Sequence, residues 1–157
     1  MIGASYQKDM LPALPGMISD TSSYNVDGNC VLDNTGTELL VGLAVKVKEV
    51  AADGLKTVML ANTGSAYGIA VRSHFMTTGK NGQMVYEPAG GINVLSAGRC
   101  WALTNDIEAK TFGTPAKVHT DGKIQHDGTI MPGWTYTGAY LKIDGDTKIA
   151  EIQLHQV

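Results

Sequence analysis

Histidine, cysteine and carboxylate side chains are the residues of this chain that could hold a metal ion. The four histidines are scattered, at His74, His119, His126 and His155, and no two stand two or four positions apart. Ligands on one strand or helix need such spacings to converge on an ion. The nearest two flank Asp121-Gly122, and a two-residue hairpin there would leave them two positions apart along the ladder. The sequence therefore predicts no metal site and no cofactor.

Nucleophilic catalysis needs a nucleophile, a base and an oxyanion site. The segment Gly64-Ser65-Ala66-Tyr67-Gly68 departs from the Gly-x-Ser-x-Gly elbow, and it lies between predicted strands with no helix to follow. None of the glycines is followed by the Lys-Ser/Thr pair of a phosphate-binding loop. The acidic residues of the Asp-Gly pairs are explained by turns. The chain is therefore predicted not to be an enzyme.

The two cysteines, Cys30 and Cys100, stand seventy positions apart and next to apolar residues. We interpret them as buried thiols that act as small hydrophobic side chains, and a disulfide between them stays open.

A sugar-stacking platform could be formed by four aromatic residues, Trp101, Trp134, Tyr136 and Tyr140. For Trp101 we favour packing in the core instead, and for Trp134 packing at an edge.

The composition of the 157 residues excludes several classes of protein. Nineteen glycines and a charged fraction of 17% argue against a helical bundle or a charged disordered chain. A net charge of −3 argues against nucleic-acid binding, which needs clustered lysine and arginine. No apolar run reaches 18 residues, so no membrane span is predicted. The first residues do not resemble a signal peptide, and synthesis in the cytoplasm is the expectation.

The residues that must position any site are predicted to be strands. Five Asp-Gly pairs and Asn81-Gly82 are typical of tight hairpin turns, because both residue types tolerate positive φ. Short segments rich in Val, Ile, Leu, Thr and Tyr lie between them. The expected strands are Cys30–Asp33, Glu38–Val47, Lys56–Ala61, Gly68–Arg72, Gln83–Tyr86, Ile92–Leu95, Arg99–Leu103, Ala116–His119, Lys123–Gln125, Gly138–Ile143 and Lys148–Leu154.

This pattern predicts an all-β fold, a jelly roll or a β-barrel or sandwich of short antiparallel strands. The best helix candidate is the short segment Val47–Leu55. We expect a hairpin at Asp121-Gly122, joining Ala116–His119 to Lys123–His126. One domain is expected over residues 29–157, preceded by an irregular arm over residues 1–28.

The arm contains Pro12, Pro15 and Gly16, so it cannot be a central strand. It also carries six apolar side chains that we expect to contact a partner chain: Tyr6, Met10, Leu11, Leu14, Met17 and Ile18. Two interpretations remain open. The segment is either a strap across its own domain or an arm that docks on another chain.

Several short motifs follow one another in an order that resembles a known family. They are Pro12-Ala13-Leu14-Pro15-Gly16-Met17-Ile18-Ser19-Asp20, Leu40-Val41-Gly42-Leu43-Ala44-Val45, Gly68-Ile69-Ala70-Val71-Arg72, Tyr86-Glu87-Pro88, Ile92-Asn93-Val94-Leu95 and Gly98-Arg99-Cys100-Trp101. A glycine-rich run from Gly113 to Gly133 and a closing strand Ile149–Leu154 complete the order. Over nearly the whole chain this resembles the structural cement, or capsid decoration, proteins of tailed bacteriophages.

The resemblance implies a non-enzymatic structural protein on the exterior of a virion capsid. It would bridge neighbouring subunits of the major capsid protein and would associate with itself there as a dimer or trimer. It implies no cofactor, no direct contact with nucleic acid and no membrane. Two alternatives stay open: a carbohydrate-binding or tail-associated β-module of a virion, and a jelly-roll enzyme of the cupin type.

Overall fold

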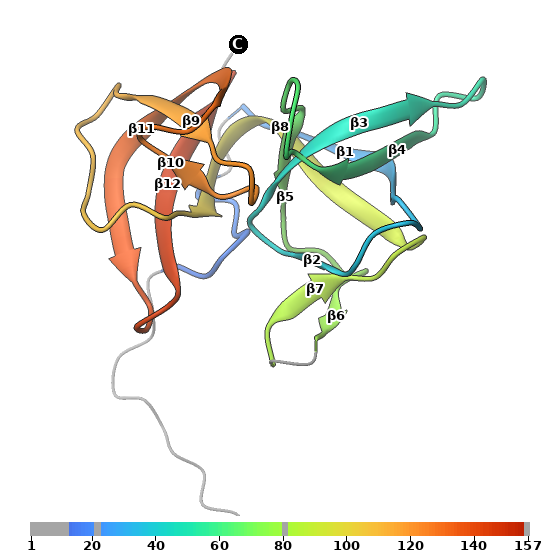
Figure 1. Cartoon of the computed structure of the whole chain (residues 1–157), viewed down its shortest axis with the longest axis horizontal. Coiled ribbons are helices and arrows are strands. Elements are labelled where there is room, and N and C mark those ends of the chain that lie inside the picture. Colours follow the sequence, from blue (N-terminus) through green and yellow to red (C-terminus); the bar gives the residue numbers. More distant parts are fainter. Residues whose placement is uncertain (1–12, 21–22, 80–81, 156–157) are drawn as a thin grey trace, which may run out of the picture.

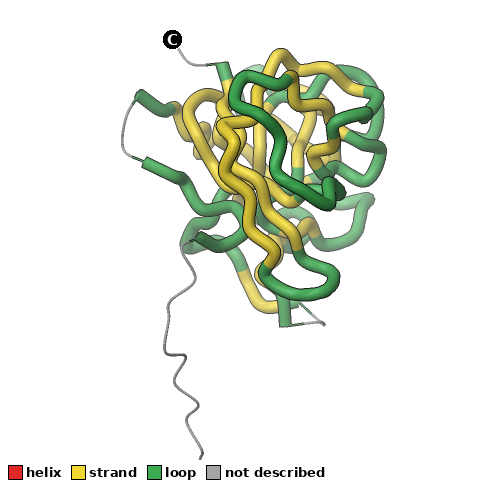
Figure 2. Tube along the Cα trace, turned by 90° about the vertical axis from the view of Figure 1, so that its left-hand side faces the viewer, coloured by secondary structure: helices red, strands yellow, loops and turns green. Residues whose placement is uncertain are grey.

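The computed structural model describes residues 13–20, 23–79 and 82–155. Over these residues the chain forms strands, turns and loops but no helix (Figure 2). The predicted all-β class is confirmed, and the architecture found is a β-barrel with additional strands. In the same ranges, no helix is long and apolar enough to cross a membrane.

The strands of the described residues are short, apart from two of thirteen residues each. They are β1 (Asn25–Leu32), β2 (Leu39–Leu40), β3 (Ala44–Val50), β4 (Lys56–Leu60), β5 (Gly68–Ala70), β6 (Thr77–Thr78), β7 (Met84–Tyr86), β8 (Gly91–Leu103), β9 (Pro115–Val118), β10 (Ile124–Gln125), β11 (Ile130–Lys142) and β12 (Lys148–Leu154).

The first half of the chain closes into a barrel, on the right of Figure 1. Its strands follow one another in the order β1-β4-β3-β5-β8, and β8 pairs back with β1. The β1–β4 pair is parallel, with Cys30 opposite Lys56, whereas the other pairs are antiparallel. Closure pairs both edges of the five-stranded sheet, so neither edge strand is left open. A small sheet, β2-β7-β6, lies below it in Figure 1.

The second half of the chain continues the same sheet in the order β8-β12-β11-β9-β10. The C-terminal half of β8 pairs with β12, from Gly98 opposite Leu154 to Leu103 opposite Ile149. At the far end, a parallel bridge between Thr104 and Ile124 brings β10 back beside the end of β8. We call the unit formed by this part of β8 and by β9 to β12 the C-terminal sheet.

Strand β8 is therefore shared by both halves. One cluster of buried apolar residues, which includes Val45, Val58 and Ile92, fills the first barrel. A second, which includes Trp134 and Ile152, lies mainly within the C-terminal sheet. The alternating burial along β8 supplies side chains to both clusters, because successive residues of a strand point to opposite faces.

The predicted hairpin at Asp121-Gly122 is present as β9 and β10, but its register differs by one residue. Val118 lies opposite Ile124, and His119 N–H donates to the Lys123 carbonyl, which leaves three loop residues instead of two. Gly122 has a φ of +81°, the left-handed conformation that a three-residue hairpin loop requires. Its carbonyl accepts a 2.9 Å hydrogen bond from Ala44 N–H, so the hairpin tip is attached to the first barrel.

Other expectations need correction. The helix candidate Val47–Leu55 is wrong, because β3 runs to Val50 and a turn follows. The segments Ile92–Leu95 and Arg99–Leu103 are parts of the single strand β8. The expected boundary between an arm ending at residue 28 and a domain starting at residue 29 falls inside β1, which begins at Asn25.

Candidate docking surface

Residues 13–20 lie across their own domain as a strap. Gly16 N–H donates to the Trp101 carbonyl (2.7 Å), Trp101 N–H to the Met17 carbonyl (2.9 Å) and Ser19 N–H to the Arg99 carbonyl (3.0 Å). The strap thus pairs with the edge of β8 that β12 leaves free, with Ile18 opposite Cys100. Of the two interpretations of the N-terminal segment, the intramolecular strap describes this part of it.

Arg72 and Gly16 fix the strap on its other side. Arg72 N–H donates to the Gly16 carbonyl (2.8 Å), and Arg72 Nη1 donates to the Pro15 carbonyl (3.2 Å). Gly16 has a φ of +73°, and a Cβ there would lie 2.0 Å from Val41 Cγ1. Only glycine fits this backbone conformation and this space. Ala13 is buried, so the strap is held as far as the first residue of the described range.

The six apolar side chains expected to contact a partner fall into three groups. Tyr6, Met10 and Leu11 lie outside the described residues. Leu14 is 40% exposed. Met17 and Ile18 are half-buried, and Ile18 packs against the cluster of the C-terminal sheet.

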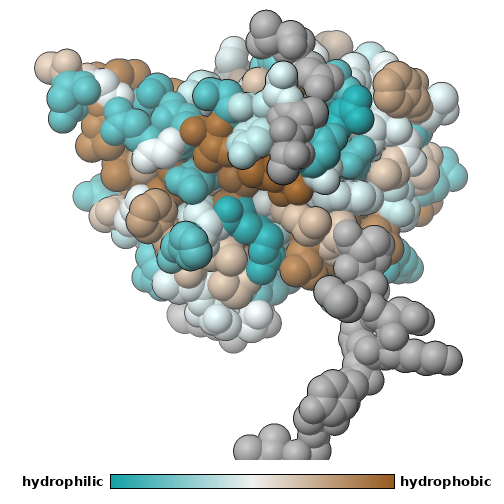
Figure 3. All heavy atoms as spheres, turned by 180° about the vertical axis from the view of Figure 1, so that it is seen from behind, coloured by the Kyte–Doolittle hydropathy of each residue, from teal (hydrophilic) through white to brown (hydrophobic). Residues whose placement is uncertain are grey.

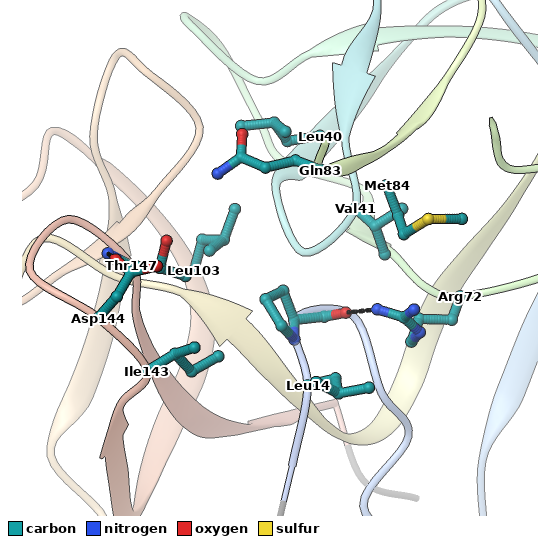
Figure 4. Close-up of a pocket in the computed structure, with 11 residues that line it drawn as sticks. Leu14, Leu40, Val41, Arg72, Gln83, Met84, Leu103, Ile143, Asp144 and Thr147 are labelled. Carbon is teal, nitrogen blue, oxygen red and sulfur yellow. Dashed lines mark hydrogen bonds between the residues drawn. The ribbon is translucent and has the colours of Figure 1, made fainter. Parts of the chain in front are cut away.

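Leu14 and Pro15 form part of a groove of about 210 Å³. Figure 4 shows Leu14 and Ile143 on one side of it and Leu40 and Gln83 on the opposite side. The remaining lining residues come from both halves of the molecule: Val41, Arg72, Met84, Leu103, Asp144 and Thr147. The groove is therefore built where the first barrel, the small sheet, the C-terminal sheet and the strap meet.

The groove is mostly apolar, with polar groups at its rim. Asp144 Oδ1 accepts hydrogen bonds from the N–H groups of Asp146 and Thr147, which lower the pKa of this carboxyl group. Arg72, whose guanidinium is held by the Pro15 carbonyl, provides a positive charge at the other end. Sequence reasoning missed this groove, because its residues are far apart along the chain and none belongs to a local motif.

Other apolar side chains are exposed away from the groove: Tyr24, Val50, Phe75, Ile107, Phe112 and Met131. On the back of the molecule, Figure 3 shows hydrophobic residues in a band across the middle of the face. Single exposed apolar side chains are common on protein surfaces, so these residues alone do not define a binding surface.

The aromatic residues do not form a sugar-binding platform. Trp134 and Tyr136 are 1% and 2% exposed, so neither ring can stack on a ligand, and the expected edge packing of Trp134 is wrong. Trp134 Nε1–H donates to His155 Nε2 (3.1 Å). Trp101, expected in the core, is only partly buried.

The buried carboxyl group of Asp106 organises the C-terminal sheet. It accepts hydrogen bonds from the Tyr136 hydroxyl and from His126 N–H (3.1 Å), while the Asp106 carbonyl accepts one from the Tyr140 hydroxyl (3.1 Å). Burial, with the carboxylate beside it, raises the pKa of Tyr136, so this hydroxyl stays protonated. This cluster joins strands and contains no free nucleophile or base.

A second polar cluster lies on the first barrel. Asp27 Oδ2 accepts a hydrogen bond from the Tyr67 hydroxyl and forms a 2.9 Å ion pair with Lys56 Nζ. Burial acts to raise the pKa of Asp27, but the hydrogen bonds from Tyr67 and Lys56 outweigh it and hold this pKa below its usual range. Among the described residues, no three His, Cys, Asp or Glu side chains converge as a metal site would require.

Both cysteines are buried and unpaired, as the interpretation of two buried thiols predicts, and no disulfide joins them. Burial, together with the charge of Asp27, raises the pKa of Cys30 to about 11. Burial also raises the pKa of Cys100. Because the thiolate is the reactive form, neither residue reacts readily at neutral pH.

In the part of the chain that the structure describes, a closed barrel and a continuing sheet meet at an apolar groove. The family model "Structural cement protein (E217 gp24/Pam3 gp6)" matches residues 2–155, and the chain belongs to this family. It is thus a structural protein of a phage capsid, found in the virion.

The fold is similar to that of a chain in the structure "The capsid of Myoviridae Phage XM1", with a TM-score of 0.70. The two chains are 17% identical, and the alignment covers 98% of each. Among curated proteins, none matches this chain.

Proposed function

We propose that this protein binds the outer surface of the capsid and bridges neighbouring subunits of the major capsid protein, which stabilises the shell. The observation that carries the proposal is the match to the structural cement family over residues 2–155. Many copies on one shell act together, because each contact raises the effective concentration of the next. The protein is made in the host cytoplasm and joins the capsid from outside.

The N-terminal arm supplies part of this attachment. Because the strap is fixed at Gly16 and Ala13, residues 1–12 start from a defined point on the domain. These residues include Tyr6, Met10 and Leu11, whose burial against a neighbouring chain contributes roughly 1.5–3 kcal/mol each before ordering costs. Leu14 extends this contact onto the described surface, whereas Met17 and Ile18 are already engaged in part with their own domain.

Deletion of residues 1–12 tests the arm. We expect the shortened chain to remain folded, since the strap is kept, and to bind capsids stripped of this protein at least about tenfold more weakly. Co-sedimentation with such capsids measures the binding. The matched control replaces Ser5 and Gln7 by alanine and keeps the apolar and charged side chains. Undiminished binding of the shortened chain would show that the attachment surface lies on the barrel.

A further inference from the structure

The groove beside Leu14 has the volume and the apolar lining to take an aromatic side chain, and residues 1–12 contain one. We propose that two copies of this protein exchange their arms, so that Tyr6 of each copy occupies the groove of the other. This deepens the proposed function, on which it rests for the role of the arm. It makes a second copy of this chain the partner of residues 1–12.

The size and the lining of the groove indicate which side chain of residues 1–12 could occupy it. A volume of about 210 Å³ exceeds the roughly 150 Å³ of a cavity known to hold benzene, so an aromatic ring fits. Tyr6 is the aromatic residue of the first twelve. Leu14, Leu103 and Ile143 offer apolar contact to such a ring, and Gln83 and Thr147 offer polar groups to its hydroxyl. Tyrosine suits this site, because one end of the side chain is apolar and the other is polar.

The charges agree with this arrangement. Lys8 follows Tyr6 by two positions, and Asp144 lies at one end of the groove. Asp9 is next in the chain, and Arg72 lies at the other end. The arm therefore carries both signs of charge, as the rim of the groove does.

The direction of the chain favours a second copy over the same copy. In Figure 4, Leu14 lies on the side of the groove opposite Leu40 and Gln83, and the ribbon beside it runs away from them. Pro12 and Pro15 each fix φ and restrict the preceding residue to extended conformations, so an immediate reversal into the groove of the same chain is disfavoured. Tyr6 lies seven positions before Ala13, and the chain between them spans at most about 25 Å. A neighbouring copy related by a two-fold axis can place its groove within this reach, and such contacts are mutual.

Disulfide trapping between two full-length chains tests the exchange in the absence of capsids. One chain keeps Tyr6 and carries Gln7→Cys beside it, and the other, with a different tag, carries Gln83→Cys at an exposed position on the rim. Neither chain can form the new bond alone, and the native thiols are buried. We expect the mixed dimer to accumulate at least about tenfold faster than in a control that pairs Gln7→Cys with Asp53→Cys, at the exposed β3–β4 tip.

Two further measurements make the test decisive. Sedimentation should show Tyr6→Ser raising the dissociation constant of the dimer at least about thirtyfold, whereas Tyr6→Phe and Gln7→Ala keep the dimer. Equal trapping at Gln83 and Asp53 would overturn the proposal. So would a doubly substituted Gln7→Cys, Gln83→Cys chain that closes on itself while the mixed dimer fails to form. Failure of capsid binding with intact exchange would instead overturn the proposed function alone.

Discussion

The first barrel and the C-terminal sheet share a strand but close in different ways. The barrel closes by backbone pairing, with β1 hydrogen-bonded to β4 on one side and to β8 on the other. The C-terminal sheet returns to β8 through the single Thr104–Ile124 bridge, and the buried Asp106 holds the surrounding segments together. In the C-terminal sheet, the free energy of closure therefore depends on the few hydrogen bonds of Asp106. In the first barrel it is distributed over many backbone hydrogen bonds.

Replacing Asp106 by alanine should have the largest effect. The change leaves the buried Tyr136 hydroxyl and the His126 N–H without their acceptor and costs about 3 kcal/mol of unfolding free energy. The expected fall in melting temperature is about 6–12 °C. Urea denaturation measures the free energy, and Asp106→Asn, which keeps one acceptor oxygen, should cost less.

Hydrogen exchange then separates the two halves. In the Asp106→Ala variant, amides of β9, β10 and β11 should exchange faster while those of β1, β3 and β4 keep their protection. An equal increase of the amide exchange rates in both halves would show that they open as one unit. The two modes of closure would then not give the halves different stabilities.

Replacing Gly122 by valine tests the contact that joins the two halves, with an intermediate effect. A Cβ at this position would lie 2.4 Å from Leu60 Cδ1, and the left-handed φ resists a β-branched residue. We expect a cost of about 2 kcal/mol in thermal or urea denaturation. In the control Gly145→Val, a Cβ meets no atom within 4 Å, and the change should stay within about 0.5 kcal/mol.

Replacing Asp27 by asparagine on the first barrel should have the smallest effect, at most about 1 kcal/mol at pH 7. Because folding lowers the pKa of Asp27, its contribution is present above the unfolded value near 3.9 and is lost as the pH falls through the folded value. The difference between the parent protein and the variant should therefore shrink as urea denaturation is repeated from pH 7 to below pH 4. A difference that stays constant over this range would assign the effect to packing.

Local patterns predicted the strand class better than the strand ends. Asp-Gly pairs between β-branched runs indicated the turns before β4 and β12, where tight turns are found. They failed where tertiary pairing overrides local preference. We expected a strand over Gly138–Ile143, yet β11 runs from Ile130 to Lys142 because β9 and β12 pair with it around two irregularities.

The candidate site was predictable only in its sequence-local part. The prolines and apolar residues of the N-terminal segment predicted an irregular segment that packs on a protein surface. The strap pairing of Ile18 with Cys100, however, joins residues more than eighty positions apart. The groove likewise gathers Leu14, Leu40, Leu103 and Ile143 by folding, and no spacing rule connects them.

The shared strand also constrains how the protein is made on the ribosome. All five strands of the first barrel have been synthesised once Leu103 has emerged, but β12, which pairs with the C-terminal half of β8, ends 51 residues later. In that interval this half of β8 has one unpaired edge, the kind of edge on which nascent chains aggregate. The strap is already available and covers the opposite edge. During synthesis, residues 13–20 can therefore pair with one edge of β8 while the partner of its other edge does not yet exist.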